Sequence, residues 1–375
     1  MKKNRSPFLF VSAVFLFLFL FAFGMVLGKA DTEKERRLPN PVPNFSISSF
    51  LRRENVRETE AFLADKIPFR SLLISTSATL SLFLKGGEHR DIIVSGNTLL
   101  SKEIPSLHGF TKTLGAMTDF LKKNENKGWQ QTAVLVPNAE WLRTPLFPDE
   151  YKTDKIGILP AAFKDLIPEG ALCDLQAAFG DKGDGLYFRG DHHLNDEGAY
   201  LAYREIAEHM GLSPYEKPNT EAVTSSFYGT TLSRLGLSWF QKESLNIPVF
   251  ENQDDFSVYK EDGSLYLQGF YDREKGQTVD AYGVYLGGNH GFLRIEKNKE
   301  KEEAPRPRML IIRDSFASSL VPYLAQHYDL ILLDPRYSSK KAAVVAEEFD
   351  VRQVLIIADA TSLSSSSFCR TFLSE

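Results

Sequence analysis

The chain is poor in cysteine, with only Cys173 and Cys369 among its 375 residues. Two thiols cannot build the multi-disulfide framework of a small secreted scaffold, and their separation gives no metal-site signal. One disulfide and two buried free thiols both remain open. The sequence also has no internal repeat and no long low-complexity tract. With 43% hydrophobic and 25% charged residues, its composition excludes a disordered chain, a collagen and a coiled coil.

A basic excess is also missing from the body of the chain. The formal net charge is −5, and residues 1–30 contain four basic residues and no acidic one. The remainder therefore carries 40 basic residues against 49 acidic ones. Phosphate binding needs clustered Lys and Arg, so we expect no nucleic acid among the partners.

The one long hydrophobic run lies at the N-terminus. No residue from Ser6 to Gly28 is charged, and the length of this run suits a membrane-spanning helix over residues 7–28. Lys2, Lys3 and Arg5 precede it, which places the body of the chain outside the cytoplasm. A cleaved signal peptide is the alternative, because Gly28-Lys29-Ala30 is a passable cleavage site, but the run exceeds a usual signal-peptide core. We expect a single-pass protein of the cell membrane.

The last seventy residues predict alternating strands and helices. Strands are expected at 308–314, 329–335 and 351–359, with helices at 316–328 and 340–349 between them. Earlier apolar runs at 132–138 and 171–175 add two more strands. This βαβαβ rhythm predicts an α/β fold with a parallel sheet and covering helices.

Other segments predict how the chain is organised around that sheet. Residues 58–85 have helical spacing broken by Pro68, residues 109–124 and 196–210 predict helices, and 91–101 two short strands. Residues 225–295 predict a β-rich insertion with a hairpin turn at Asp262-Gly263. We therefore divide the chain into a cytoplasmic stub and anchor (1–30), a juxtamembrane spacer (31–57) and one large domain (58–375).

A first candidate for chemistry is the sequence GDHH, which contains Asp191, His192 and His193. The preceding GLYFRG predicts a strand, and Asn195 predicts the cap of the next helix, so these residues are expected at a strand's carboxyl end. An Asp two residues from a His can orient the imidazole. Two exposed histidines are, however, more often without function, and adjacent side chains point to opposite faces.

A second candidate is Ser315, which follows a hydrophobic strand and precedes a helix. A serine at such a turn is a plausible nucleophile, with helix N–H groups nearby to stabilise an oxyanion. The alternative is ordinary helix capping by Asp314 and Ser315, which is the commoner role of this pair.

Glycine-rich and aromatic loops supply weaker candidates. LGGNHGF offers Gly288 and Asn289 as donors to an oxyanion or a sugar hydroxyl, although a plain turn is the commoner meaning of such a sequence. FYGT places Tyr228 on a substrate-facing loop. A metal set of His192, His193 and His290 is conceivable, but its ligand spacing is unconvincing, so we predict no metal.

Taken in order, GDHHLND, FYGT, GGNHGF and the terminal RDSF…LILLDPRY resemble the DHHW family of exported bacterial proteins. That family is similar to the SGNH-hydrolase-like domains of the alginate O-acetylation proteins. The resemblance covers most of residues 58–375 and implies a flavodoxin-like SGNH sheet. The ordered set is more specific than any one motif.

The resemblance implies that Ser315 is a nucleophile, His193 its base and Asp191 the residue that orients His193. The chain order Asp, His, Ser reverses the usual SGNH order. Two positions depart from the family pattern: Leu194 replaces a Trp, and Arg313 replaces the Gly before Asp-Ser, where it could crowd the turn or clamp an anion. His192 and Tyr228 would contact substrate.

The resemblance implies an O-acetyltransferase or acetylesterase that acts on a cell-surface polysaccharide and needs no cofactor. It also implies a membrane-embedded acyl-donor protein as a partner. Two alternatives remain. One is a non-catalytic glycan-binding or assembly protein that keeps the fold, and the other is a metal-dependent hydrolase.

Overall fold

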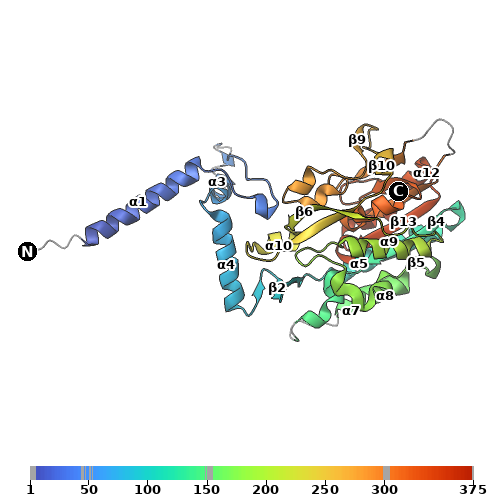
Figure 1. The fold of residues 1–375 in the computed structure, drawn as a ribbon, viewed down its shortest axis with the longest axis horizontal. Coiled ribbons are helices and arrows are strands. Elements are labelled where there is room, and N and C mark those ends of the chain that lie inside the picture. Colours follow the sequence, from blue (N-terminus) through green and yellow to red (C-terminus); the bar gives the residue numbers. More distant parts are fainter. Residues whose placement is uncertain are drawn as a thin grey trace, which may run out of the picture. The chain divides into compact units, whose positions relative to one another are not determined.

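The structure is a computed structural model that describes residues 6–43, 46, 48–49, 52, 54–147, 149, 155–298 and 305–373 (Figure 1). The chain forms two compact units. One comprises Met1–Arg90 and Leu232–Phe240, and the other Asp91–Thr231 and Gln241–Glu375. The predicted cytoplasmic residues Lys2, Lys3 and Arg5, and residues 299–304 of a charged loop, lie outside the described residues.

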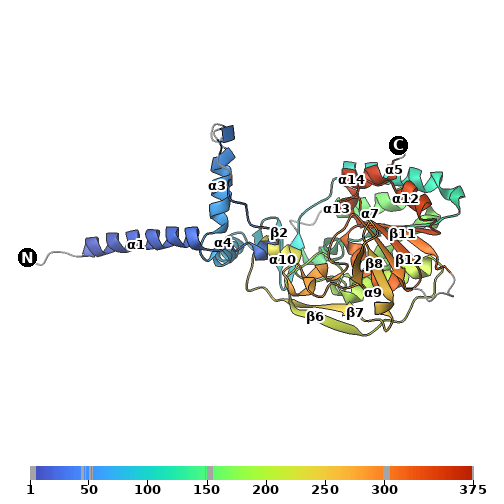
Figure 2. The same cartoon turned by 90° about the horizontal axis from the view of Figure 1, so that it is seen from above.

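The first unit is mainly helical. Its elements are α1 (Ser6–Leu27), η1 (Glu33–Glu35), α3 (Glu54–Asp65), α4 (Arg70–Leu84) and β1 (Glu88–His89). The helices α3 and α4 meet at an angle of 91°, and Pro68 lies in the turn between them, as the sequence predicts (Figure 2). Within the described residues, no single helix has both the length and the hydropathy to cross a membrane, although α3 and α4 together pass that test as a bent pair.

The second unit holds most of the strands and the candidate site. Its strands are β2 (Ile92–Ser95), β3 (Thr98–Ser101), β4 (Gln130–Val136), β5 (Leu172–Cys173), β6 (Thr220–Phe227), β7 (Glu243–Pro248), β8 (Phe256–Tyr259), β9 (Leu265–Gln268), β10 (Phe292–Lys297), β11 (Arg308–Arg313), β12 (Asp329–Leu333) and β13 (Gln353–Asp359). Its helices are α5 (Leu107–Lys123), α6 (Ala139–Leu142), α7 (Lys155–Leu166), α8 (Leu175–Phe179), α9 (Asp196–His209), α11 (Val321–Leu324), α12 (Ala342–Glu348), α13 (Ala360–Leu363) and α14 (Ser366–Phe372). The short α10 (Thr230–Leu235) runs from this unit into the first.

Five parallel strands form the larger part of the central sheet. The sheet order is β5-β4-β13-β11-β12-β10-β8-β9, and the pairs from β5 through β12 are all parallel. All five of these strands were expected from their apolar runs. Because parallel strands end at the same edge, the loops after β4, β11, β12 and β13 gather at that edge of the sheet.

The sheet is mixed and not purely parallel, which corrects the sequence prediction. Strands β10, β8 and β9 continue it in antiparallel pairing, so part of the predicted insertion extends the central sheet. The reason is local: β8 and β9 are joined by the short turn at Asp262-Gly263, and so short a connection permits only antiparallel pairing. The remaining pair, β6 and β7, forms a separate antiparallel ribbon.

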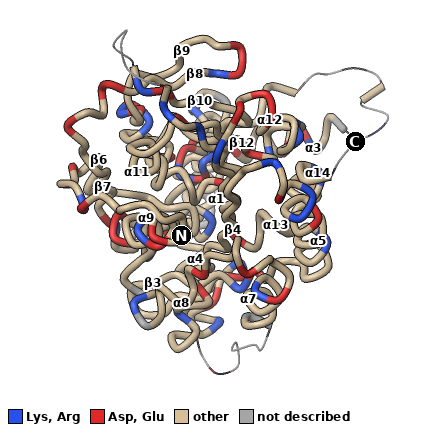
Figure 3. Tube along the Cα trace, turned by 90° about the vertical axis from the view of Figure 1, so that its right-hand side faces the viewer, with Lys and Arg blue, Asp and Glu red and all other residues tan. Residues whose placement is uncertain are grey.

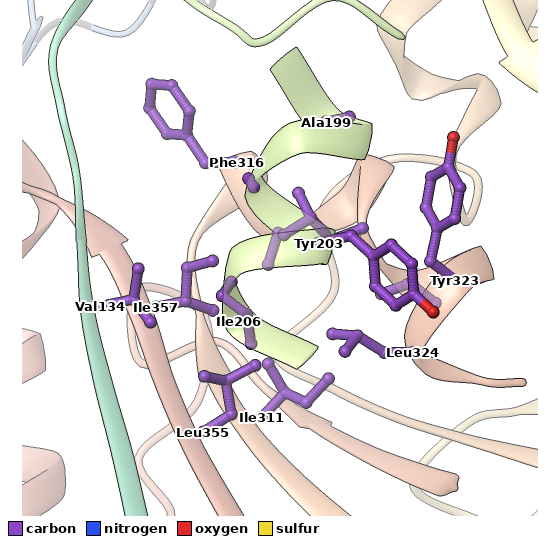
Figure 4. Close-up of a cluster of buried hydrophobic side chains, with 14 of the residues drawn as sticks. Val134, Ala199, Tyr203, Ile206, Ile311, Phe316, Tyr323, Leu324, Leu355 and Ile357 are labelled. Carbon is purple, nitrogen blue, oxygen red and sulfur yellow. The ribbon is translucent and has the colours of Figure 1, made fainter. Parts of the chain in front are cut away.

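Apolar side chains cover both faces of the sheet. On one face, α9 packs Tyr203 and Ile206 over Ile311, Leu355 and their neighbours (Figure 4). On the other face, α5, α7, α12 and α14 enclose a second cluster that includes Leu310 and Ile312. Alternate residues of β11 thus point into different cores, which is why this strand is a continuous apolar run without a polar face. The sheet is therefore a rigid support for the loops at its carboxyl edge.

Two predicted elements are wrong in detail. GLYFRG is not a strand, because residues 186–194 fold back on themselves and form only the isolated bridge between Tyr187 and Leu194. The helix predicted at 316–328 is a short 3-10 helix, η10 (Ser315–Ser319), followed by the single turn of α11. Pro322 in the first turn of α11 has no N–H to continue a helix from η10.

Both cysteines are buried and free in the structure. Burial raises the pKa of the Cys173 thiol to about 12, so this group is protonated and unreactive at neutral pH. Charged residues of both signs are interspersed along the described chain (Figure 3).

Candidate active site

Two segments that are far apart in sequence meet at the carboxyl edge of the sheet. The ring Nε2 of His193 lies 2.9 Å from Ser315 Oγ, which is hydrogen-bonding distance. His193 comes from the loop before α9, and Ser315 is the first residue after Asp314 at the end of β11. The spatial convergence on which the sequence-based mechanism depends is therefore present.

Asp191 completes a chain of three side chains. Its Oδ1 lies 2.6 Å from His193 Nδ1 and also accepts the backbone N–H of His193 at 2.8 Å. Burial alone would raise the pKa of Asp191, but His193 and His192 and the hydrogen bonds to the carboxylate hold it well below its usual range. The carboxylate is therefore ionised and fixes a proton on His193 Nδ1, which leaves Nε2 free to accept one from the serine.

The serine stands on a turn that is braced by its neighbours. One oxygen of Asp314 accepts the N–H of Phe316 at 2.9 Å, and the other accepts the N–H of Asp359 at 2.8 Å. Burial and the nearby Asp359 carboxylate raise the pKa of Asp314 to about 7. Asp314 is thus the helix cap that the sequence suggested, and this leaves Ser315 Oγ for His193.

Arg313 is fully buried and bonds to the nucleophile turn. Its Nη1 donates to Ser318 Oγ at 2.8 Å and to the Asp314 carbonyl at 3.2 Å. Its Nε and Nη2 have no hydrogen-bond partner among the described residues. Burial lowers the pKa of its guanidinium. Arg313 therefore stabilises the turn through these two hydrogen bonds and does not crowd it.

The histidine loop is held by backbone hydrogen bonds from two sides. Glu243 accepts the N–H groups of Arg189 at 2.6 Å and Gly190 at 3.1 Å. Thr230 donates its backbone N–H to Asp191 Oδ2. Gly229 makes that approach possible, because a Cβ there would lie 2.3 Å from the Gly190 carbonyl oxygen. The FYGT motif therefore supports Asp191. Tyr228, the residue before Gly229, is buried.

Aromatic rings surround the imidazole of His193. Tyr282 stacks on it with ring centroids 3.9 Å apart and planes 14° apart, and Phe316 lies 5.3 Å away. His192 lies 4.0 Å from the same ring and is more exposed. The sequence analysis missed Tyr282, since it belongs to a short 3-10 turn, Ala281–Val284, with no recognisable motif.

Gly288 and Asn289 are not brought to Ser315 by any hydrogen bond among the described residues. The Gly288 N–H donates to the Tyr285 carbonyl at 3.1 Å, and Asn289 is exposed. Both belong to a turn in which Leu286, Gly287 and Gly288 have positive φ. LGGNHGF therefore forms a turn, which is the commoner of the two meanings considered for this sequence.

The side chains of Asp191, His192 and His193 also have the composition of a metal site. One ligand atom from each lies within 4.8 Å of the others. Both ring nitrogens of His193 are, however, already engaged by Asp191 and Ser315, so a metal bound to His193 would replace one of these contacts. His290 is not part of this group. The donor set fits hydrogen bonding better than metal coordination.

One family model matches part of the chain. Residues 108–260 match the family model described as the SGNH hydrolase-like domain, acetyltransferase AlgX. This segment of the chain is similar to an SGNH hydrolase-like domain. The matched segment contains Asp191 and His193 and ends before Ser315. No curated protein matches the chain in sequence.

Solved structures show the same fold at low sequence identity. PatB1 of Bacillus cereus is 20% identical with a TM-score of 0.60, and the alignment covers 74% of this chain and 98% of that one. A DHHW family protein from Eubacterium siraeum is 17% identical with a TM-score of 0.58, covering 76% of this chain and 99% of that one. PatB1 with a sulfonyl adduct gives a TM-score of 0.59. The resemblance predicted from the sequence is confirmed.

Proposed function

We propose that the protein is an acyltransferase or esterase that moves an acetyl group through Ser315, with His193 as the base and Asp191 as its orienting partner. The proposal depends on two consecutive hydrogen bonds. One joins Asp191 Oδ1 to His193 Nδ1 at 2.6 Å, and the other joins His193 Nε2 to Ser315 Oγ at 2.9 Å. All three side chains are buried, and Ser315 is the most exposed of them at 9%.

The first half-reaction forms an acyl-serine. Ser315 Oγ attacks the ester carbonyl while His193 Nε2 takes its proton, and Asp191 stabilises the resulting imidazolium. The tetrahedral intermediate collapses, the bond from the acyl carbon to the donor oxygen breaks, and His193 returns the proton to the departing alcohol. The acetyl group is then an ester of Ser315.

The second half-reaction returns the enzyme to its starting state. His193 takes a proton from an acceptor hydroxyl, whose oxygen attacks the acyl carbon and displaces Ser315 Oγ. The serine recovers its proton from His193. A sugar hydroxyl as acceptor makes the protein a transferase, and water makes it an esterase.

We further propose that the acceptor is a polysaccharide at the cell surface, with the body of the chain outside the cytoplasm and residues 7–28 as its anchor. The family match to acetyltransferase AlgX and the uncharged N-terminal run support this assignment. The acetyl donor would be delivered by a membrane-embedded partner protein.

Replacement of Ser315 by alanine tests the proposed role. In purified full-length protein, Ser315→Ala should lower kcat/KM for hydrolysis of an activated acetyl ester by at least about 10³-fold, because the nucleophile is removed. Ser264→Ala is the control, since this serine is exposed in the turn between β8 and β9, where its hydroxyl bonds to Asp262 at 2.6 Å. That control should keep most of the activity.

An unchanged thermal midpoint in Ser315→Ala would show that the fold survives. Wild-type hydrolysis by this variant would reject the acyl-serine mechanism and favour a glycan-binding or assembly protein with the same fold.

A further inference from the structure

Helix α4 in the first unit presents a row of large apolar side chains to the outside. The exposed members are Phe69 before the helix and Leu72, Leu73, Leu80, Phe83 and Leu84 within it. At 3.6 residues per turn these positions fall on one face that is about 120° wide. Phe83 is 83% exposed and Phe69 is 78% exposed, so this face, which we term the α4 stripe, is not covered by the part of the chain that the structure describes.

The opposite face of α4, which packs within the first unit, carries one polar and two apolar residues. Ser75, Ala78 and Leu82 are its buried residues. Ser75 Oγ lies 2.9 Å from Ser238 Oγ and accepts the N–H of Ser238 at 3.0 Å. An ordinary surface helix turns most of its large apolar side chains inward, whereas α4 buries only Leu82 among them and exposes five. Among the described residues, the α4 stripe has no apolar covering.

Polar groups beside the stripe are satisfied without water. Thr76 lies in the middle of the stripe, and its hydroxyl donates to the Leu72 carbonyl at 2.8 Å. The hydroxyl of Thr79 donates to the Ser75 carbonyl at 2.7 Å. Trp239 is exposed at the border of the stripe, and its indole N–H donates to Thr79 Oγ1 at 2.8 Å. Tryptophan with a satisfied N–H and an exposed ring is typical of the membrane–water interface.

The stripe begins where the apolar helix α1 ends. A Cβ at Gly24 would lie 2.9 Å from Pro68 Cγ, so the last turns of α1 contact the corner before α4. Asp31 then accepts the N–H of Ser71 at 3.2 Å and its hydroxyl at 2.6 Å, which ties the residues after α1 to the first turn of α4. Helix α1 is itself covered with exposed Phe and Leu side chains. The two apolar surfaces are continuous at this corner.

We propose that α4 lies in the plane of the membrane surface, with the α4 stripe in the lipid beside the outer end of α1. This inference rests on the proposed anchoring by residues 7–28. At about 1.5 Å per residue, 15 residues are too short to cross a core of roughly 30 Å but suit an in-plane helix. Lys66 and Lys85 flank the helix, and no acidic residue lies between Asp65 and Glu88. Such flanks suit anionic headgroups.

Spin labels on the full-length chain test this placement. Single nitroxides at Phe83→Cys and Leu80→Cys report on α4, one at Phe17→Cys reports on α1, and one at Tyr337→Cys reports on an exposed position of the second unit. The native cysteines are buried, and labelled wild type gives their background. The protein is reconstituted in vesicles of phosphatidylcholine and phosphatidylglycerol. Collisions with oxygen, which concentrates in lipid, are compared with collisions with a water-soluble nickel chelate.

We expect the oxygen-to-nickel ratio at Phe83 and Leu80 to be several-fold higher than at Tyr337. A ratio equal to that at Tyr337, with a high ratio at Phe17, would overturn the inference and leave the anchor standing. A low ratio at Phe17 would contradict the anchor instead. Immobile labels on α4 that neither reagent reaches would also overturn the inference, because they would show a second copy of the protein on the stripe.

Discussion

At the scale of single residues, the site depends on the hydrogen bonds that both ring nitrogens of His193 make. Asp191 holds one nitrogen at 2.6 Å, and Ser315 is 2.9 Å from the other. Tyr282 stacks on the ring and restricts its rotation. Orientation and tautomer are thus fixed before a substrate arrives, which is the preorganisation that acyl transfer requires.

Replacement of Asp191 by asparagine tests this orientation. We expect Asp191→Asn to lower kcat on the order of 10³- to 10⁴-fold, because the amide can favour the wrong tautomer of His193 and cannot stabilise the imidazolium. His192→Asn is the matched control, since His192 is the neighbouring, partly exposed histidine, and it should change kcat far less. Equal losses in the two variants would contradict the assigned roles.

Metal removal provides a second test at the same scale. Because both ring nitrogens of His193 are engaged in hydrogen bonds, we expect ester hydrolysis to survive dialysis against a strong chelator. Loss of activity that is restored by a divalent cation would instead support the group formed by Asp191, His192 and His193 as a metal centre.

At the scale of elements, the loop 227–230 and the loop 189–193 form one support. The backbone N–H of Thr230 reaches Asp191 only because Gly229 has no side chain. The approach is close enough that a methyl group would also lie 2.5 Å from Asp191 Cβ. Neither contact involves a flexible side-chain end, so the loops would have to move apart.

Gly229→Ala should therefore reduce both stability and kcat. We expect a loss of about 1–3 kcal/mol in the free energy of unfolding, the usual cost of overpacking, and a misplaced Asp191. Gly115→Ala is the control: this glycine lies inside α5 with nothing within 4 Å of an added Cβ. There the alanine should stabilise by up to about 1 kcal/mol. Wild-type activity and urea midpoint in Gly229→Ala would show that the two loops are not coupled.

Prediction from the sequence succeeds where an element contains its own pattern. The strands β11, β12 and β13 are continuous apolar runs, and α9 is marked by the Asn195 cap, whose side chain accepts the Gly198 N–H at 3.0 Å. The pair of Asp191 and His193 and the turn at Ser315 were recognisable for the same reason. Their meeting was an inference from the parallel sheet and the family resemblance.

The remaining parts were unpredictable because distant residues decide them. GLYFRG has a strand-like composition, yet its backbone pairs within its own loop, through bonds such as Phe188 N–H to the His193 carbonyl. Tyr282 has no motif, and only the tertiary fold stacks it on His193. Gly288 was assigned by motif to an oxyanion site, although its N–H is used within its own turn.

At the scale of the whole molecule, Asp314 links the site to the pH dependence of folding. Its carboxyl has an ordinary value of 3.8 when unfolded and a pKa of about 7 when folded, because of burial and the nearby Asp359. Between these values the folded state binds more protons than the unfolded state. The contribution of Asp314 to stability is therefore fully present below about 3.8 and is lost as the pH rises through 7.

Asp314→Asn should remove that part of the pH dependence. We expect the free energy of unfolding of the variant, measured in urea at several pH values, to fall less steeply than wild type from about pH 4 to about pH 7. Parallel curves for the two proteins would show that Asp314 is ionised throughout this range.

Covalent labelling tests the central claim most directly. The wild-type chain is treated with an arylsulfonyl fluoride, and the modified peptide is identified by mass spectrometry alongside Ser315→Ala and Asp191→Asn. We expect one sulfonyl group on Ser315 in the wild type, none in Ser315→Ala, and much slower labelling in Asp191→Asn, because His193 activates the serine. A label on another residue, or a Ser315 that reacts no faster than free serine, would contradict the proposed acyl-transfer centre.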